Sequence, residues 1–306
     1  MRITRRDYLR ASTAAGVALS LKASGMLDIE KAWAAGTKPV VLWLQAQGCT
    51  GCSVSFLNSI YYATVDTLLT QTLDVQYHTT VMAAAGQMAV NAANAARNRG
   101  NYILVVNGAI PTGAAGKYCM LWPGMTALDG VKAFAANAST IIAVGTCAAF
   151  GGIPGGAPNP TGAKSVGSIL GTTSKLINVP GCPAHPDWLV GTVSYIMQNG
   201  KLPVLDSQRR PTTYYGSTVH SHCPRRESET GSYIGGSNCL YGMGCKGPRT
   251  HCDCPSRKWN SGTAGQAGVN WCVESCTPCH GCTEPTFPDG MDPFLTVNNT
   301  PRAYDD

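Results

Sequence analysis

Four short apolar runs divide the first two thirds of the chain. They are residues 40–44 (VVLWL), 102–106 (YILVV), 141–144 (IIAV) and 176–179 (LINV). Runs of this length with few charges are typical of parallel strands buried on both faces. An alanine-rich stretch with helical spacing, 82–99, lies between the first two runs. The pattern predicts an α/β fold, a doubly wound parallel sheet with helices between its strands.

The alternation of strand-like and helix-like segments fades after about residue 205. Glycine, proline and serine become frequent there, and nine of the 14 cysteines lie between Cys223 and Cys282. Apolar burial alone is not expected to order about 100 residues with so little regular structure. We therefore expect a regular domain over 35–205 and an irregular domain over 206–306, held by additional bonds.

Cysteine follows glycine in the turns after three of the predicted strands. These turns contain Cys49 and Cys52 after the first run, Cys147 after the third and Cys182 after the fourth. The carboxyl ends of parallel strands meet at one edge of the sheet, where ligands bind. The spacing therefore predicts that these four thiols converge on one site.

Charge and composition exclude one class of partner and raise a question about the cysteines. Charged residues make up only 13% of the chain, and six of its 23 Lys and Arg lie in residues 1–34. The remaining chain is near neutral, so nothing indicates the dense phosphate neutralisation of a nucleic-acid-binding protein. A chain of 306 residues buries enough surface to fold without disulfides, so its cysteines call for metal chemistry or for export to an oxidising compartment.

The first 34 residues have the pattern of an export signal. Arg5 and Arg6 precede a mild apolar run over 11–21, and Ala32-Trp33-Ala34 resembles a cleavage site. The paired arginines look like a twin-arginine signal, which exports folded proteins to the periplasm. The alternative is the basic start of an amphipathic helix. The run is shorter than the roughly 20 residues that span a bilayer, and no later run is longer, so we expect no membrane anchor.

The C-terminal cysteines fall into two groups. One contains His220, Cys223, Cys239 and Cys245, and the other extends from Cys252 and Cys254 to Cys272, Cys276, Cys279 and Cys282. A two-residue gap, as between Cys279 and Cys282, lets two thiolates hold one metal centre. Zinc sites use the same spacing. A secreted binding protein with seven disulfides is the alternative from another functional class.

Six stretches carry a specific family resemblance: LWLQAQGCTGCSVS, AVGTCAAFGGIPGG, VPGCPAHPDWLVGT, VHSHCPRR, CLYGMGCKGP and GVNWCVESCTPCHGCTEP. Over residues 39–294 the chain resembles the small subunit of nickel-iron hydrogenases. The resemblance implies a flavodoxin-like domain with a proximal iron-sulfur cluster, followed by an irregular domain with medial and distal clusters. It also implies a large partner subunit that holds the nickel-iron centre and reversibly oxidises hydrogen. Electrons would pass to an external acceptor such as a cytochrome c, and no residue of this chain would be catalytic.

The family motifs imply three ligand sets. The proximal set is Cys49, Cys52, Cys147 and Cys182; the distal set is His220, Cys223, Cys239 and Cys245; and the medial set is Cys254, Cys272, Cys279 and Cys282.

Some positions stay open at this level. His222 is the alternative to His220 as a distal ligand, and Cys276 is the alternative to Cys272 as a medial ligand. Cys119, Cys252 and Cys276 match no family ligand; Cys119 is expected to pack as a small apolar residue, and the other two to form a disulfide with each other or stay free.

The residue after Asn270-Trp271 distinguishes two kinds of medial cluster. Many relatives have proline there and a 3Fe-4S centre, whereas Cys272 supplies a fourth sulfur, as in selenium-containing members. The resemblance therefore implies three 4Fe-4S clusters, with 3Fe-4S as the medial alternative. An iron-sulfur protein that works without a large subunit is a further reading of the same cysteines.

The signal leads to a test of export. We expect Arg5→Lys combined with Arg6→Lys to leave both subunits in the cytoplasm, because the partner is expected to travel on the signal of this chain. Cell fractionation with immunoblotting measures this. A large subunit that still reaches the periplasm contradicts this account of export.

Overall fold

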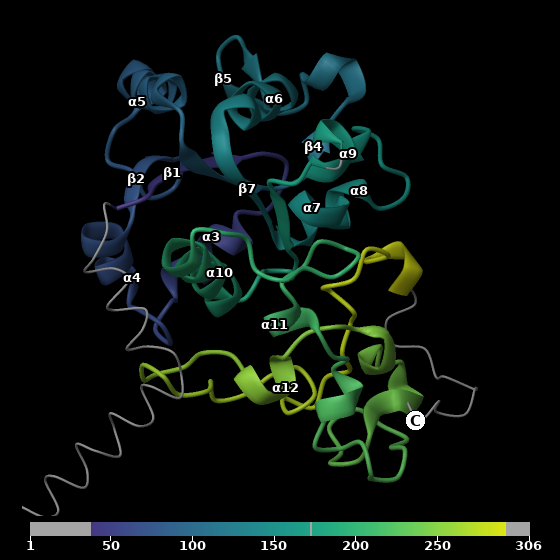
Figure 1. Cartoon of the computed structure of the whole chain (residues 1–306). Helices are drawn as coiled ribbons and strands as arrows, with labels where there is room; N and C mark the ends of the chain where they lie inside the picture. The colour runs from purple at the N-terminus through teal and green to yellow at the C-terminus, as the bar shows by residue number, and fades with distance from the viewer. Residues whose placement is uncertain (1–37, 172, 292–306) are drawn as a thin grey trace, which may run out of the picture.

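The computed structural model describes residues 38–171 and 173–291 (Figure 1). The predicted signal over 1–34 lies outside these residues. Within them, no helix combines the length and apolar character needed to cross a membrane.

Five parallel strands form the central sheet, and they confirm the α/β prediction. Their order across the sheet is β2-β1-β3-β7-β9, and every neighbouring pair is parallel. This is the strand order of flavodoxin-like folds, in which the order reverses beside the first strand. The strands are β1 (Val40–Gln45), β2 (Asp74–His78), β3 (Tyr102–Asn107), β7 (Ala138–Val144) and β9 (Leu176–Val179).

Two local features differ from the sequence prediction. Strand β2, with the sequence DVQYH, has no apolar run because it lies at the sheet edge and its first three residues are only half-buried. The helix predicted from residue 82 begins later, as α5 (Gly86–Arg99). Residues before it form a turn, in which the Met82 N–H donates to the His78 carbonyl, and Ala85 is extended.

Alternate residues of each strand bury into two separate cores. Trp43 of β1 packs on the face covered by α3 (Gly51–Leu57) and α10 (Pro186–Asn199). Leu42 packs on the opposite face, covered by α5 and α6 (Ala127–Asn137). Figure 1 shows these helix pairs on either side of the sheet. Both strand faces are therefore apolar, which explains the continuous apolar runs.

Short elements complete the α/β part. They are α4 (Val65–Thr67), η1 (Leu68–Thr72), η2 (Gly113–Gly116), α7 (Gly145–Phe150), α8 (Gly152–Gly155), α9 (Val166–Leu170), and the two-stranded pairs β4 (Ile110–Pro111) with β8 (Ala163–Lys164) and β5 (Met120–Trp122) with β6 (Met125–Thr126).

The chain after α10 is irregular, as predicted, and packs below the α3–α10 layer (Figure 1). Val219, Leu240, Trp271 and Val273 join the core that α3 and α10 share with the sheet. The helices described here are each four residues or fewer: α11 (Thr212–Tyr215), η3 (His220–His222), η4 (Leu240–Met243), η5 (Gly247–Arg249), α12 (Cys254–Arg257) and η6 (Asp289–Met291).

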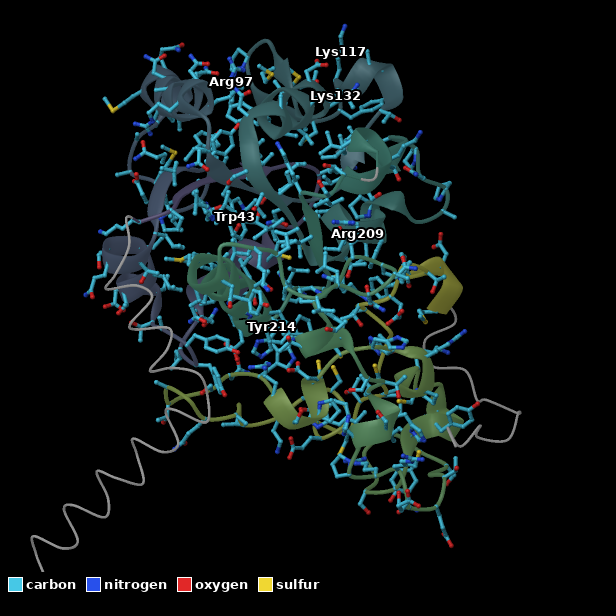
Figure 2. All side chains as sticks on the ribbon, in the orientation of Figure 1. Trp43, Arg97, Lys117, Lys132, Arg209 and Tyr214 are labelled. Carbon is cyan, nitrogen blue, oxygen red and sulfur yellow. The ribbon has the colours of Figure 1, made fainter. Side chains whose placement is uncertain are left out.

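A mostly buried guanidinium links α12 of the irregular segment to α10. Arg257, whose side chain is 13% exposed, contacts Asp187 at 3.1 Å and Asp253 at 2.8 Å. Its Cζ lies 5.3 Å from the Tyr61 ring centroid and 5.1 Å from that of Tyr214. Figure 2 labels Tyr214, which lies where the two parts meet. Two carboxylates and two aromatic faces thus surround one cation.

A second buried guanidinium fixes the end of the described chain. Arg210, only 4% exposed, contacts Asp206 at 2.7 Å and Glu284 at 2.9 Å, and donates to the Thr283 carbonyl. Glu284 also accepts the His251 N–H at 2.6 Å. Charge-assisted hydrogen bonds thus hold a segment that lacks strands and long helices.

Removing the charge of Arg257 should destabilise the protein in a pH-dependent way. Burial raises the pKa of Asp187 to about 6, although Arg257 lowers it. A carboxyl whose folded pKa is raised contributes stability at low pH that is lost as pH rises through that value. Arg257→Leu removes the lowering effect and leaves buried carboxylates unpaired, which costs about 3–5 kcal/mol at neutral pH and less at about pH 5.

Thermal unfolding of the purified complex at both pH values measures this effect. Adding Asp187→Asn to Arg257→Leu is the matched control, because it removes one unpaired carboxylate, and it should recover part of the loss at neutral pH. An equal loss for Arg257→Leu at both pH values contradicts the electrostatic account.

Candidate metal centres

The four predicted proximal cysteines meet at the carboxyl edge of the sheet. Cys49 lies in the turn between β1 and α3, Cys52 lies in the first turn of α3, Cys147 lies in α7 after β7, and Cys182 follows β9. The thiols are close enough that ionised Cys147, Cys182 and Cys49 each oppose ionisation of Cys52. The convergence expected from the strand ends is therefore present.

Burial dominates the electrostatics of this site. Desolvation is the largest cause that raises the pKa of Cys52 to about 12 and that of Cys147 to about 11. Neighbouring thiols add to both increases. A bound cation would offset both effects, because metal binding requires and stabilises thiolates.

Glycine at position 145 makes room for this convergence. Gly145 has φ +80, and a Cβ placed on it would lie 2.4 Å from the Cys52 sulfur. Any side chain would therefore collide with a candidate ligand. This position requires glycine for both its backbone conformation and its space.

A cavity of about 130 Å³ contains the predicted medial cysteines. Cys272 is exposed at the rim of this cavity, yet desolvation by the surrounding protein raises its pKa to about 11, and Cys254 adds the largest effect of a neighbouring thiol. Trp271 also lines the cavity, and its Nε1 is buried with no hydrogen-bond partner among residues 38–171 and 173–291. The medial cysteines on the wall are Cys254, Cys272, Cys279 and Cys282.

Cys252, which matched no family ligand, lines the same cavity. It is 2% exposed, and its thiol interacts with that of Cys254. The sequence places it in the same cysteine group as the medial ligands, two residues before Cys254, but no family motif gives it a ligand role. The structure adds Cys252 to the thiols on the wall of the medial cavity.

Cys276 lies apart from this cavity wall. Its sulfur accepts a hydrogen bond from Arg225 Nη2 at 3.4 Å. All 14 cysteines are in the described part of the chain and all are free thiols, so Cys252 and Cys276 are not joined. Of Cys272 and Cys276, the two candidates for the fourth medial ligand, the cavity wall therefore contains Cys272.

The predicted distal residues line a second, smaller cavity. His220, in η3, is 4% exposed, whereas His222 is exposed. Arg225 and Val273 complete part of the wall. The four candidate ligands on it are His220, Cys223, Cys239 and Cys245.

The remaining residues of interest belong to the cores. Cys119 is partly buried and packs against the core under α5 and α6, as expected of a small apolar residue. Trp43 stacks on His78, with ring centroids 4.6 Å apart, and Trp188 donates to Asp253 at 2.7 Å. Of the three tryptophans near cysteine motifs, Trp271 lines a thiol cavity.

Fold and site together define a class of protein: a flavodoxin-like α/β unit with thiol sites at its carboxyl edge and in an appended irregular segment. Two family models match the chain. Residues 49–196 match the 20-kDa subunit of NADH ubiquinone oxidoreductase, and residues 215–295 match the C-terminal part of the NiFe/NiFeSe hydrogenase small subunit.

Individual relatives cover nearly the whole chain. The periplasmic NiFeSe hydrogenase small subunit of Desulfomicrobium baculatum is 37% identical over 97% of this chain and 100% of its own length. The periplasmic NiFe hydrogenase small subunit 1 of Nitratidesulfovibrio vulgaris is 37% identical over 95% of this chain and 93% of its own. The structure of the reduced, active NiFeSe hydrogenase from Desulfomicrobium baculatum has a chain that aligns with a TM-score of 0.79 and 38% identity, covering 86% of this chain and all of that one.

The chain therefore belongs to the family of NiFe and NiFeSe hydrogenase small subunits. Members of this family are parts of oxidoreductase heterodimers and carry iron-sulfur clusters. The resemblance seen in the sequence motifs is confirmed.

Gly145 provides a test of the proximal site. We expect Gly145→Ala to lower the iron content of the purified protein, because the new methyl group would displace the Cys52 sulfur. Gly200→Ala is the matched control: Gly200 also has positive φ, +62, but a Cβ there meets nothing within 4 Å. Iron analysis and electron paramagnetic resonance measure the loss, and equal iron in the two variants contradicts this role of Gly145.

Proposed function

We propose that this chain relays electrons through three iron-sulfur clusters between a nickel-iron site in a large partner subunit and an external acceptor such as a cytochrome c. The proximal ligands are Cys49, Cys52, Cys147 and Cys182, the medial ligands are Cys254, Cys272, Cys279 and Cys282, and the distal ligands are His220, Cys223, Cys239 and Cys245. The clusters supply one-electron oxidation and reduction, and the reaction of the heterodimer is the reversible oxidation of hydrogen.

The observation that supports this most is the succession of the three thiol groups. Cys182 of the proximal set also lines the medial cavity, and the medial Cys279 lies beside Cys245 of the distal set. Neighbouring groups thus adjoin each other through the protein. Such a series fits a relay better than three independent structural metal sites.

The donor chemistry also suits clusters. Among residues 38–171 and 173–291, no group of three or more His, Cys, Asp or Glu is arranged to hold a single metal ion. Thiols spread around a cavity are the usual ligands of polynuclear iron-sulfur centres. Trp271 Nε1, a buried donor with no acceptor in the described part of the chain, suits a site whose occupant carries sulfur acceptors.

The role of the irregular domain and the route of export belong to the same proposal. Residues 35–205 form the domain with the proximal cluster, and residues 206–306 form the domain with the other two. The N-terminal signal over 1–34 carries the folded heterodimer by the twin-arginine route to the periplasm, as the periplasmic names of the relatives suggest for them.

A cofactor analysis of the purified heterodimer tests the proposal against the disulfide-rich alternative. Broad absorption near about 400 nm, with iron and inorganic sulfide sufficient for three clusters, is expected from iron-sulfur centres. Copurification with a nickel-containing subunit tests the partner and excludes a protein that works alone. A colourless chain without sulfide contradicts the proposal.

The medial site yields a sharper prediction. Cys272 faces the same cavity as the three other medial cysteines, which supports a 4Fe-4S cluster with four thiolates. Four thiolates should lower the potential relative to a 3Fe-4S centre with three. We expect Cys272→Pro to create a 3Fe-4S signal in electron paramagnetic resonance of the oxidised protein.

Two cysteine variants serve as controls. Cys276→Ser should not create the signal, because the Cys276 sulfur contacts Arg225. Cys252→Ser should not create it either, and a signal in that variant would identify Cys252 as the fourth ligand. A stoichiometric 3Fe-4S signal in the unmodified protein refutes the 4Fe-4S assignment.

A further inference from the structure

Close contacts join each ligand set to the next. The backbone N–H of Cys279, in the medial set, donates to the sulfur of Cys245, in the distal set, at 3.3 Å. Cys182, in the proximal set, lines the same cavity as Cys282, in the medial set. Each pair of successive sets therefore meets at one place in the protein.

The approach of Cys182 to Cys282 depends on how two separate segments are held together. Cys182 follows Gly181 at the end of β9, whereas Cys282 lies about 100 residues later in a segment without regular structure. Backbone regularity cannot fix their separation, because no strand or helix contains both. A side chain must set it.

Thr146 supplies this connection. Its side-chain hydroxyl donates to the Cys282 carbonyl and accepts the Gly181 N–H at 2.9 Å. Its own N–H donates to the Gly181 carbonyl at 3.0 Å. Thr146 is 1% exposed and directly precedes Cys147, another proximal residue.

We propose that Thr146 is the positioning residue for electron transfer between the proximal and medial sites, because its hydroxyl ties the backbone next to Cys182 to the backbone of Cys282. The proposal rests on the proposed function. In each transfer one electron leaves the proximal site and one enters the medial site. No proton moves, and no bond to Thr146 forms or breaks.

The two hydrogen bonds of the Thr146 hydroxyl affect both the path and the energy of the transfer. Electrons couple better through covalent and hydrogen bonds than across a van der Waals gap, and these two bonds connect the Gly181–Cys182 backbone to that of Cys282. A hydroxyl that donates to the backbone of a ligand residue also stabilises the more negative, reduced state, and such outer contacts help set cluster potentials. Loss of the Thr146 hydroxyl would leave the Gly181 N–H and the Cys282 carbonyl without this partner inside the protein.

Two variants of the complete heterodimer separate the hydroxyl from the rest of the side chain. Thr146→Val keeps the shape and removes the hydroxyl, and Thr146→Ser keeps the hydroxyl and removes the methyl group. Redox titration followed by electron paramagnetic resonance gives the medial and distal potentials. The same spectra give the magnetic splitting between the reduced proximal and medial sites.

We expect Thr146→Val to shift the medial potential downward and weaken the proximal–medial splitting, with the distal potential unchanged. Thr146→Ser should retain both properties of the unmodified protein. The exchange of hydrogen gas with deuterium that the partner's nickel-iron site catalyses should continue in both variants, because this reaction needs no electron relay.

Each other outcome is informative. Unchanged medial potential and splitting in Thr146→Val overturn the inference, as does an equal downward shift in Thr146→Ser. If Thr146→Val does not assemble, Thr146→Ser still decides, because a lowered medial potential there excludes the hydroxyl as the cause. A missing medial signal in the unmodified protein refutes the proposed function instead.

Discussion

Thiols that converge inside a protein repel one another when they ionise, and this electrostatic constraint governs both parts of the chain. At the proximal site, burial and neighbouring thiols raise the pKa of Cys52 to about 12. Burial also raises the pKa of Cys279 and Cys282 at the medial site. Positive charge from bound iron offsets these costs, so folding around the thiols and metal binding are linked. The irregular domain is thus expected to owe much of its order to its cofactors.

Protein contacts must still bring the thiols together before any metal can hold them. Two buried guanidinium groups do this for the irregular segment. Arg257 ties α12, which begins with Cys254, to α10, and Arg210 ties Glu284, two residues after Cys282, to Asp206. Buried ion pairs of this kind are costly to break, because the remaining charge is left unpaired in the interior. They position medial ligands where strands and long helices are absent.

Close approach at the sheet edge depends on small residues and one hydroxyl. Gly145 leaves space for the Cys52 sulfur, and Thr146 beside it joins the loop after β9 to the Cys282 segment. Adjacent positions in α7 therefore serve two sites. Because these two residues are adjacent, the proximal and medial groups adjoin each other although their cysteines are far apart in sequence.

The sequence by itself determined the α/β class, four of the five sheet strands and the three groups of candidate ligands, because strands buried on both faces leave continuous apolar runs and ligand motifs are local. Only the tertiary structure decided the rest. Edge strand β2 is half-buried and leaves no apolar run, and Cys252, which the sequence left either free or paired with Cys276, lies on the wall of the medial cavity. The contrast between Cys272 and Cys276, and the role of Thr146, likewise depend on segments distant in sequence. Periodicity reports which face of an element is buried, but contacts between irregular segments arise only when the chain is packed in three dimensions.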